Sequence, residues 1–335
     1  MKRASVMCVE KILVIFPKRL GDALMCTPAL KVLADCFPTA TIDALAESAL
    51  GGVVASRNPH VNKVLVEPSE DQLRDIAKGY QLGVNLHCAV NHDRDFLKLL
   101  KTENTDLRAV YPVDQDKAVH QSAHNIRSLA NQLKTSLDVD DMPYEFLITE
   151  NDRLSLRERL QSQGVDVDKQ HLVVFQLGCH GIQKNAKPWK FWKKMGHKRT
   201  WNWERFWTLE CKLRKHDPNI TIVLQGAGKE RLLVEQYQRK STRAVGFVDA
   251  GIEELAALLE KCDCLVTPDT GTMHLGCAMG SPMVAMFGPT SPACTGPHPL
   301  REDIKILKGA SLEDISVDSV CAAVCELLPI QPEVE

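Results

Sequence analysis

The sequence predicts an α/β protein made of two facing, doubly wound domains. Short apolar runs alternate with helical patterns along the chain, and this alternation stops once in the middle and then resumes. The length of 335 residues also favours two domains over a single hydrophobic core. Because ligands of such sheets bind at the carboxyl ends of the strands, we expect a cleft between the domains.

The first half of the chain shows strands in alternation with helices. Residues 11–17 (KILVIFP) form a nearly continuous apolar run, which is typical of a strand buried on both faces. Residues 22–36 follow with helical periodicity, and Pro38 ends that helix. Further strands are expected at residues 41–46, 63–67 and 81–86, and further helices at residues 93–102 and 117–133.

Residues 137–167 interrupt the alternation with an acidic, proline-containing stretch and a charged helix. We therefore expect an N-terminal domain of residues 1–165 and a C-terminal domain of residues 166–335. The last helix is a candidate to pack back on the N-terminal domain. In the second half, strands are expected at residues 172–177, 221–225, 264–267 and 283–287, and helices at residues 203–216, 229–240, 252–261 and 270–279.

Composition excludes several classes of function. A net charge of −2 gives no overall field that would attract nucleic acid. No apolar run is long enough to span a membrane, and residues 12–16 are too few for a signal peptide, so we expect a soluble, cytoplasmic protein. The twelve cysteines contain no CxxC pair and most lie in apolar segments, which predicts reduced, buried thiols and no metal site.

The first candidate site is the turn after the first strand, Lys18-Arg19-Leu20-Gly21-Asp22. Gly21 suits a tight strand-to-helix turn, but the turn lacks the GxGxxG spacing of dinucleotide-binding proteins. Asp22 is either the N-cap of the following helix or a general base held at the carboxyl end of the strand. Its position alone leaves both interpretations open.

A second candidate site lies where the strand at residues 264–267 meets the next helix. Small polar residues there would leave the helix N-terminus open to an anion: Asp269, Thr270, Gly271 and Thr272, followed one turn later by His274. The alternatives are a helix cap for Asp269 and a buried core position for His274. A Gly- and Pro-rich loop at residues 288–298 should emerge at the same edge of the sheet.

Glu230 follows a glycine-rich turn, Gly226-Ala227-Gly228, at the end of another expected strand. A glutamate in this place either caps the helix that begins there or accepts hydrogen bonds from the two hydroxyls of a ribose.

Residues 184–207 combine tryptophan with positive charge. All five tryptophans of the chain lie in this segment, and seven lysines and arginines precede Trp201 without an acidic residue among them. The helical spacing of Trp203 and Trp207 predicts core packing. Trp189 and Trp192, among the lysines of residues 184–198, suit an anionic membrane surface or a phosphorylated lipid, and a basic loop without a partner is the alternative.

Three segments resemble the lipopolysaccharide core heptosyltransferases of glycosyltransferase family 9. KILVIFPKRLGDALMCTPALKVLADCFP resembles the opening of that family, and VTPDTGTMHLGCAMGSPMVAMFGPTSPACTGP resembles its nucleotide-binding loop and the strand that follows. HKRTWNWERF resembles its element of a basic residue, a tryptophan and a helix. The resemblance runs in order over most of the chain.

This resemblance implies a GT-B fold with two Rossmann-like domains and an inverting transfer of heptose from ADP-heptose to the lipopolysaccharide inner core. Asp22 falls on the family's catalytic base, within the acceptor turn that holds Lys18, Arg19 and Gly21. The resemblance also places residues at the nucleotide sugar: Asp269, Thr270, Gly271, Thr272 and His274 at the diphosphate, and Glu230 at the ribose. Lys198 or Arg199 would contact the phosphates, with Arg199 at the spacing where the family has a lysine.

The resemblance implies a nucleotide-sugar donor, an acceptor built on a lipid (Kdo-lipid A or a heptose on it) and neither a cofactor nor a metal ion. The inner face of the inner membrane is a candidate surface for peripheral binding. Two alternatives remain: a glycosyltransferase of the same fold that uses another nucleotide sugar, and a nucleotide-binding module without turnover. An NAD-dependent dehydrogenase is disfavoured by the missing GxGxxG.

Overall fold

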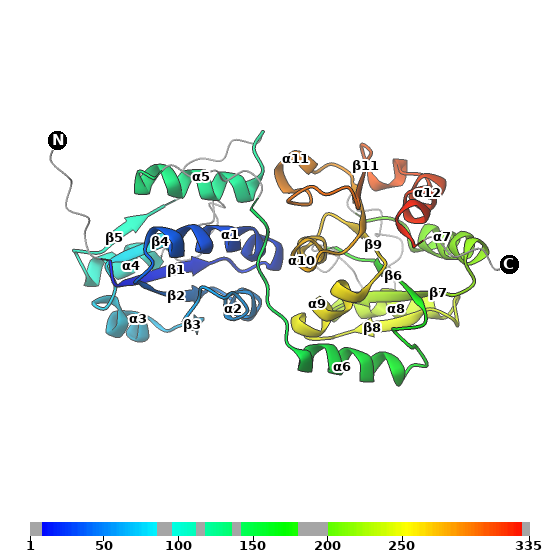
Figure 1. Ribbon diagram of the computed structural model, residues 1–335, viewed down its shortest axis with the longest axis horizontal. Coiled ribbons are helices and arrows are strands. Elements are labelled where there is room, and N and C mark those ends of the chain that lie inside the picture. The colour runs from blue at the N-terminus through cyan, green and yellow to red at the C-terminus, as the bar shows by residue number, and fades with distance from the viewer. Residues whose placement is uncertain (1–8, 86–95, 112–117, 136–141, 180–199, 330–335) are drawn as a thin grey trace. The chain divides into compact units, whose positions relative to one another are not determined.

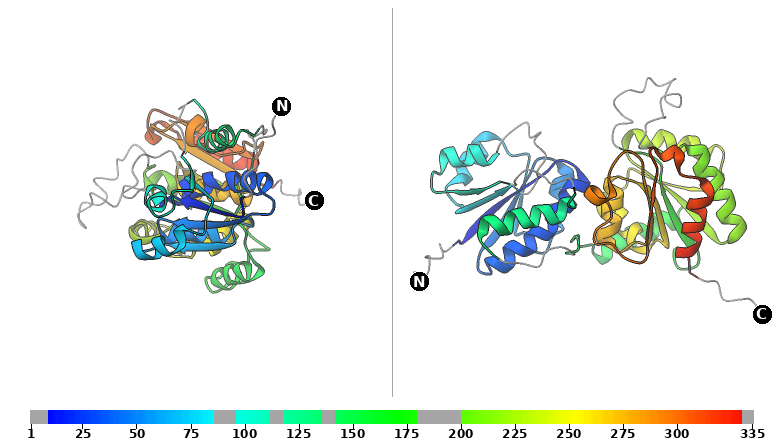
Figure 2. Two further views of the ribbon diagram at one scale, coloured as in Figure 1. Left: turned by 90° about the vertical axis from the view of Figure 1, so that its left-hand side faces the viewer. Right: turned by 90° about the horizontal axis from the view of Figure 1, so that it is seen from above.

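The computed structural model of the chain describes residues 9–85, 96–111, 118–135, 142–179 and 200–329. The chain divides into two compact units, Met1–Leu147 and Ile148–Glu335. Each unit consists of a parallel sheet with helices on both faces (Figures 1 and 2), so the α/β fold class is confirmed.

The first unit contains a five-stranded sheet in the order β3-β2-β1-β4-β5. Its strands are β1 (Lys11–Phe16), β2 (Thr41–Ala46), β3 (Lys63–Val66), β4 (Leu82–Asn85) and β5 (Arg108–Val110), and its helices are α1 (Leu20–Cys36), α2 (Ala49–Ser56), α3 (Glu70–Ala77), α4 (Phe96–Glu103) and α5 (Gln121–Leu133). The central strand β1 pairs with β2 through Phe16 opposite Ala46 and with β4 through Val14 opposite Val84. All its residues after Lys11 are buried, as expected for a parallel strand covered on both faces.

The second unit contains a six-stranded sheet in the order β11-β10-β9-β6-β7-β8. Its strands are β6 (His171–Gln176), β7 (Ile220–Gly226), β8 (Val245–Val248), β9 (Cys264–Pro268), β10 (Met283–Phe287) and β11 (Ile304–Lys308). Its helices are α6 (Glu150–Gln161), α7 (Trp203–His216), α8 (Arg231–Gln238), α9 (Ile252–Lys261), α10 (Gly271–Met279), α11 (Pro292–Thr295) and α12 (Val317–Leu327), with 3-10 turns η3 (Gly228–Glu230) and η4 (Leu312–Asp314).

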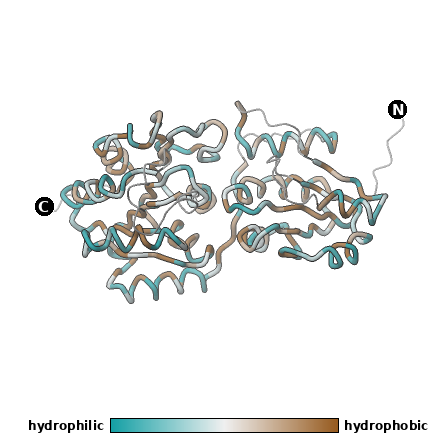
Figure 3. Tube along the Cα trace, turned by 180° about the vertical axis from the view of Figure 1, so that it is seen from behind, coloured by the Kyte–Doolittle hydropathy of each residue, from teal (hydrophilic) through white to brown (hydrophobic). Residues whose placement is uncertain are grey.

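The hydrophobic core of the second unit lies mainly between one face of this sheet and helices α7, α8 and α12. Alternate residues of each strand point into it, such as Val173 and Phe175 of β6 and Ile222 and Leu224 of β7. The residues between them therefore point to the opposite face, which α9 and α10 cover. Figure 3 shows the strands of both units largely in hydrophobic colours and the helices with hydrophilic outer faces.

The boundary between the units lies earlier than the expected boundary between residues 165 and 166. Helix α6 belongs to the second unit because it packs on α9, where Arg153 pairs with Glu260 and Arg159 with Glu254. The last helix, α12, packs against α7 and β10 of its own unit.

The cysteines in the described part of the chain are free thiols. Cys26, Cys262, Cys264 and Cys277 are buried as expected, whereas Cys36, Cys321 and Cys325 are only partly buried. Burial raises the pKa of the Cys262 thiol to about 12 and that of Cys277 to about 11, which keeps both protonated. Within the described ranges, none of the helices combines the length and apolar character needed to cross a membrane.

Candidate active site

The carboxyl end of β1 is the switch point of the first sheet, because the chain builds β2 and β3 on one side of β1 and then β4 and β5 on the other. The predicted turn Lys18–Asp22 lies there. Lys18 and Arg19 are exposed, Gly21 is buried and Asp22 is half-buried. Helix α1 begins at Leu20 with Arg19 in the N-cap position, so Asp22 is the third residue of the helix and not its N-cap.

The connection between β2 and α2 holds this turn in place. Ser48 Oγ donates a hydrogen bond to the Lys18 carbonyl at 2.8 Å and accepts one from the Gly51 amide at 3.1 Å, which caps α2. A Cβ on Gly51 would lie 2.5 Å from the Pro17 carbonyl oxygen, so only glycine allows α2 to come this close. Neither residue was predicted from the sequence, because Ser48 is soon followed by two glycines, which disfavour a helix on local grounds.

Helix α5 lies along α1 with an unusually polar buried face. Asn125 Nδ2 donates to the Met25 carbonyl at 3.4 Å and Gln121 Nε2 donates to Asn125 Oδ1 at 2.7 Å. Five of its polar residues are buried: Gln121, Ser122, His124, Asn125 and Ser128. Met25 lies only three residues after Asp22, so this polar face meets α1 close to the candidate base.

The carboxyl ends of β6 and β9 form the switch point of the second sheet, because the chain builds outward from β6 through β7 to β8 and then returns to β9. The second candidate site lies at this point. Thr270 is the N-cap residue of α10, and its side chain makes no capping hydrogen bond. The N-cap side chain therefore leaves the first amides of α10 available, which suits an anion.

The hydroxyls of this site bond within the protein. Thr267 Oγ1 donates to the Pro268 carbonyl at 2.8 Å and lies 3.2 Å from Thr270 Oγ1. Since Thr267 has one proton, Thr270 is the donor between the two. Thr272 Oγ1 donates to Gln176 Oε1 at 2.8 Å. The backbone amides of α10, more than these two hydroxyls, are thus the free donors for a phosphate.

Asp269 is buried, and it precedes the N-cap residue, so the cap interpretation is wrong for this aspartate. Thr295 Oγ1 donates to Asp269 Oδ2 at 3.5 Å, which places the loop after β10 at the same edge, as expected. Lys308 Nζ donates to the carbonyls of Gly288 and Thr290 and so fixes the start of that loop. His274 is 3% exposed, one turn into α10.

Glu230 is the remaining predicted residue at the carboxyl edge of the second sheet. Its Oε2 accepts from the Ala227 amide and from Gln176 Nε2, each at 3.3 Å, so it caps η3. Burial raises the pKa of the Glu230 carboxyl above its ordinary value. A Cβ on Gly178 would lie 2.3 Å from Glu230 Oε1, so this glycine leaves room for the carboxylate.

Gln176 thus links α10 to Glu230, because it accepts from Thr272 and donates to Glu230. Gln176 was not predicted as a site residue; in the sequence it is a single glutamine at the end of an otherwise apolar strand.

Only the last part of the basic and tryptophan-rich segment at residues 184–207 lies within the described residues. Lys198, Arg199 and residues 184–198, with Trp189 and Trp192, lie outside the described residues. Trp201 is buried and its Nε1 donates to the Ile315 carbonyl at 3.2 Å. Trp203 packs against the core as predicted, but Trp207 is 40% exposed, because its position on α7 faces away from the sheet.

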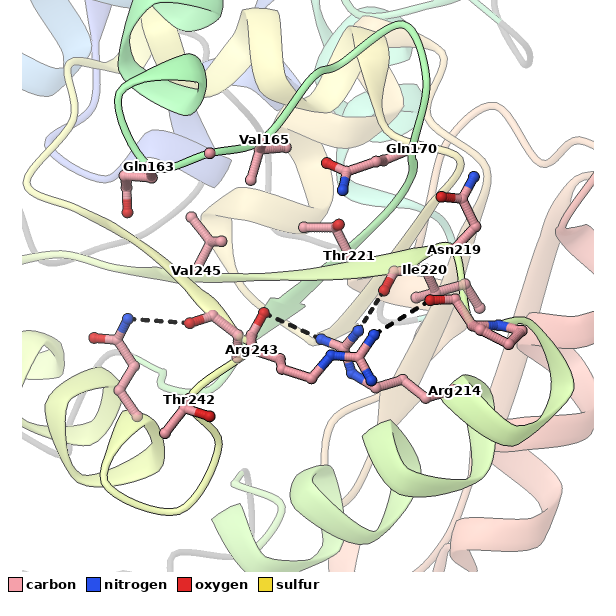
Figure 4. Close-up of a pocket in the computed structure, with 14 residues that line it drawn as sticks. Gln163, Val165, Gln170, Arg214, Asn219, Ile220, Thr221, Thr242, Arg243 and Val245 are labelled. Atoms are coloured by element: carbon pink, nitrogen blue, oxygen red, sulfur yellow. Dashed lines mark hydrogen bonds between the residues drawn. The ribbon is translucent and has the colours of Figure 1, made fainter.

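A separate polar hollow of about 440 Å³ lies at the amino ends of β7 and β8 (Figure 4). Figure 4 shows Arg214 and Arg243 reaching into it. Arg214 donates to the carbonyls of Ile220 and Arg243, at 2.6 and 3.1 Å, and pairs with Glu210 at 2.8 Å. These bonds tie the surrounding loops together, and the hollow lies at the edge opposite to the one where doubly wound sheets bind ligands.

Comparison with known proteins adds to this geometry. The family model described as Glycosyltransferase family 9 (heptosyltransferase) matches residues 108–323. The chain is 24% identical over 376 aligned positions to lipooligosaccharide heptosyltransferase 2 of Haemophilus ducreyi, and the alignment covers 95% of this chain and 99% of that protein.

Two solved structures share the fold. A glycosyl transferase family 9 protein from Veillonella parvula has a TM-score of 0.77 at 21% identity, over 95% of this chain and 97% of that one. The E. coli ADP-heptose lps heptosyltransferase II has a TM-score of 0.71 at 19% identity, over 95% of this chain and 98% of that one. The fold is therefore GT-B, as the sequence resemblance implied.

Proposed function

Because the chain belongs to glycosyltransferase family 9 (heptosyltransferase), we propose that it transfers heptose from ADP-heptose to the inner core of lipopolysaccharide. The acceptor is Kdo-lipid A or a heptose already attached to it, and the anomeric carbon is inverted. The observation that carries this proposal is the donor edge of the second unit, where the open N-terminus of α10 is linked through Gln176 to Glu230. The names of the Haemophilus and E. coli relatives support the same donor and acceptor.

In this proposal the second unit binds ADP-heptose. The amides at the start of α10, next to Asp269, Thr270 and Gly271, hold the diphosphate and stabilise the charge that it gains as the glycosidic bond breaks. Lys198 or Arg199 adds positive charge to the same group. Glu230 accepts hydrogen bonds from the ribose hydroxyls.

The first unit supplies the base. Asp22 takes the proton of the acceptor hydroxyl while that oxygen attacks the anomeric carbon from the side opposite the diphosphate. A single displacement of this kind inverts the anomeric carbon and needs neither a covalent intermediate nor a second carboxylate. Lys18 and Arg19, both exposed beside Asp22, suit an acceptor that carries negative charge.

The experiment that tests the proposal is donor profiling. The protein is incubated with a heptose-free lipopolysaccharide core or with a core that carries one heptose, and with ADP-heptose, UDP-glucose or GDP-mannose in parallel. Transfer from ADP-heptose alone supports the proposal, whereas transfer from another sugar nucleotide would favour a different glycosyltransferase of the same fold.

We further propose that the reaction needs no metal ion, because helix amides and basic side chains neutralise the diphosphate. Activity should therefore persist in excess EDTA. Loss of activity with EDTA, restored by a divalent cation, would contradict this part of the mechanism.

A further inference from the structure

Two glutamines lie side by side at the carboxyl edge of the second sheet, and among the described residues the side-chain oxygen of only one of them has a hydrogen-bond donor. Gln176 on β6 and Gln225 on β7 are in register, so both point to the face of the sheet that α10 covers. Gln176 bonds Thr272, Glu230 and the Gly178 carbonyl. Gln225 is 8% exposed, and its Oε1 is buried without a hydrogen-bond donor among the described residues.

A buried carbonyl oxygen without a donor is costly, and most proteins avoid it. If Gln225 served only to fill the core, an apolar side chain of similar size would be buried at a lower free-energy cost. It lies directly before Gly226, at the end of the strand that leads to Glu230. A ligand that brings a donor to this oxygen would remove the cost.

The order of the strands places this oxygen along the path of a nucleotide. From β9 through β6 to β7 and β8, the carboxyl edge presents the N-terminus of α10, then Gln176 with Glu230, and then Gln225. A nucleoside diphosphate with its phosphates at α10 and its ribose at Glu230 extends its base toward β7 and β8. The turns after these two strands are held together there, because the Gly228 amide donates to Asp249 Oδ1 at 2.9 Å and Arg231 pairs with Asp249.

We propose that Gln225 selects the base of the donor by accepting a hydrogen bond from the exocyclic amino group of adenine. This inference rests on the proposed function, since it takes the diphosphate and ribose positions from it. Adenine carries a hydrogen-bond donor at that position, whereas guanine and uracil carry carbonyl oxygens. An acceptor at Gln225 therefore favours ADP and opposes GDP and UDP, because a wrong base leaves two acceptors facing each other.

The test compares nucleotide affinities by calorimetry in the full-length wild type, in Gln225→Met and in Gln161→Met. Methionine keeps the length of the side chain without a comparable acceptor, and Gln161 is an exposed glutamine on α6 of the same unit. In Gln225→Met, ADP affinity should fall by about tenfold while UDP and GDP affinities stay within about twofold, so that the preference for ADP shrinks. Gln161→Met should match the wild type. The Tm of Gln225→Met should not be lowered, since Gln225 Oε1 accepts no hydrogen bond from the described part of the protein.

An ADP-to-UDP affinity ratio in Gln225→Met equal to that of the wild type would overturn the assignment of Gln225. If the wild type still transfers heptose from ADP-heptose in that case, the proposed function stands and only this inference fails. A wild type that binds no ADP would contradict both.

Discussion

At the scale of single residues, the proposed mechanism assigns the proton transfer to Asp22. Asp22→Asn keeps the size of the side chain but cannot take a proton, so kcat should fall by about 10²–10⁴-fold while ADP affinity stays nearly unchanged. Asp35→Asn is the matched control, because Asp35 is an exposed aspartate of the same helix and pairs with Lys31 at 2.9 Å on the helix surface. Steady-state kinetics beside ADP calorimetry checks this, and a near-normal kcat in Asp22→Asn would remove Asp22 as the base.

If Glu230 binds the ribose as proposed, nucleotide binding should depend on pH. Burial raises the pKa of its carboxyl above the ordinary 4.5, so the proton returns at a higher pH than for an exposed glutamate. If the carboxylate binds the ribose, ADP affinity should decline as the pH falls through this raised pKa. The fold itself gains stability in that direction, because the folded state binds the proton more tightly than the unfolded state, so unfolding would not explain the loss.

The measurement is ADP affinity as a function of pH in the wild type and in Glu230→Gln. The ionisation of ADP itself is common to both proteins. Affinity of the variant should be lower near neutral pH and should lack the extra decline at acidic pH. Two parallel profiles would show that Glu230 serves only as the cap of η3.

The sequence located Asp22 and the α10 loop because each follows a strand directly and opens a helix. It could not identify Ser48, Gln176 or the polar face of α5. Ser48 reaches the Lys18 carbonyl only because β1 and β2 are neighbours, and Gln176 meets Thr272 only because β6 and β9 flank the switch point. Such contacts depend on the order of the strands in the sheet, which cannot be predicted from the local sequence pattern.

At the scale of elements, Gly51 and Gly178 have different predicted roles. Gly51 allows two elements to pack closely, and Gly178 leaves room for a residue of the proposed site. Alanine at Gly51 would bring its Cβ within 2.5 Å of backbone at Pro17, so Gly51→Ala should lower the free energy of unfolding by about 1–3 kcal/mol. At Gly178, the atoms nearest to an added Cβ belong to the Glu230 side chain, which can move, and not to the backbone. Gly178→Ala should therefore unfold like the wild type but bind ADP more weakly.

Chemical denaturation and ADP calorimetry on both variants test this contrast. Each variant is the control for the other, since both add one methyl group. Normal ADP affinity in Gly178→Ala would mean that Glu230 does not need its present position to bind nucleotide.

Pattern alone predicted most of the strands and helices. β2, α7, α9 and β10 have the expected bounds, because each lies between clear ends. The outer strand β3 and the short strand β4 were also expected, with bounds within one residue of those observed. Several other short or outer elements were missed. Strand β5 has three residues at the edge of its sheet, β8 and β11 are the outer strands of theirs, and α2 contains Gly51 and Gly52, which disfavour a helix on local grounds.

At the scale of the whole molecule, the boundary between the two units could not be predicted from sequence composition. The charged helix α6 buries only Leu156 and Leu160, so its pattern does not reveal which unit it joins. Helix α6 joins the second unit through its contacts with α9, which include ion pairs with Glu254 and Glu260. These ion pairs join residues about a hundred positions apart.

A proposal about membrane binding also belongs to the scale of the whole molecule. We propose that residues 184–198, with Trp189 and Trp192, attach the protein to an anionic membrane that carries the lipid acceptor. Each lysine near such a surface contributes roughly 1 kcal/mol, and salt screens this attraction over about 8–10 Å at physiological ionic strength. The protein should therefore co-sediment with anionic but not neutral liposomes, and salt should release it.

The control replaces Lys187, Lys190, Lys193 and Lys194 by glutamate and should abolish co-sedimentation while ADP affinity is kept. Equal sedimentation of this variant and the wild type would show that the segment is a basic loop without a membrane partner.

The central claim is heptose transfer, and mass spectrometry of the acceptor tests it most directly. Purified protein is incubated with ADP-heptose and a heptose-free Kdo-lipid A core, in parallel with a core that already carries one heptose, and with Asp22→Asn as the inactive control. We predict that one of the two cores gains the mass of a single heptose with the wild type and neither does with Asp22→Asn. Both cores unchanged with folded wild-type protein that binds ADP, or equal transfer by Asp22→Asn, would contradict the account.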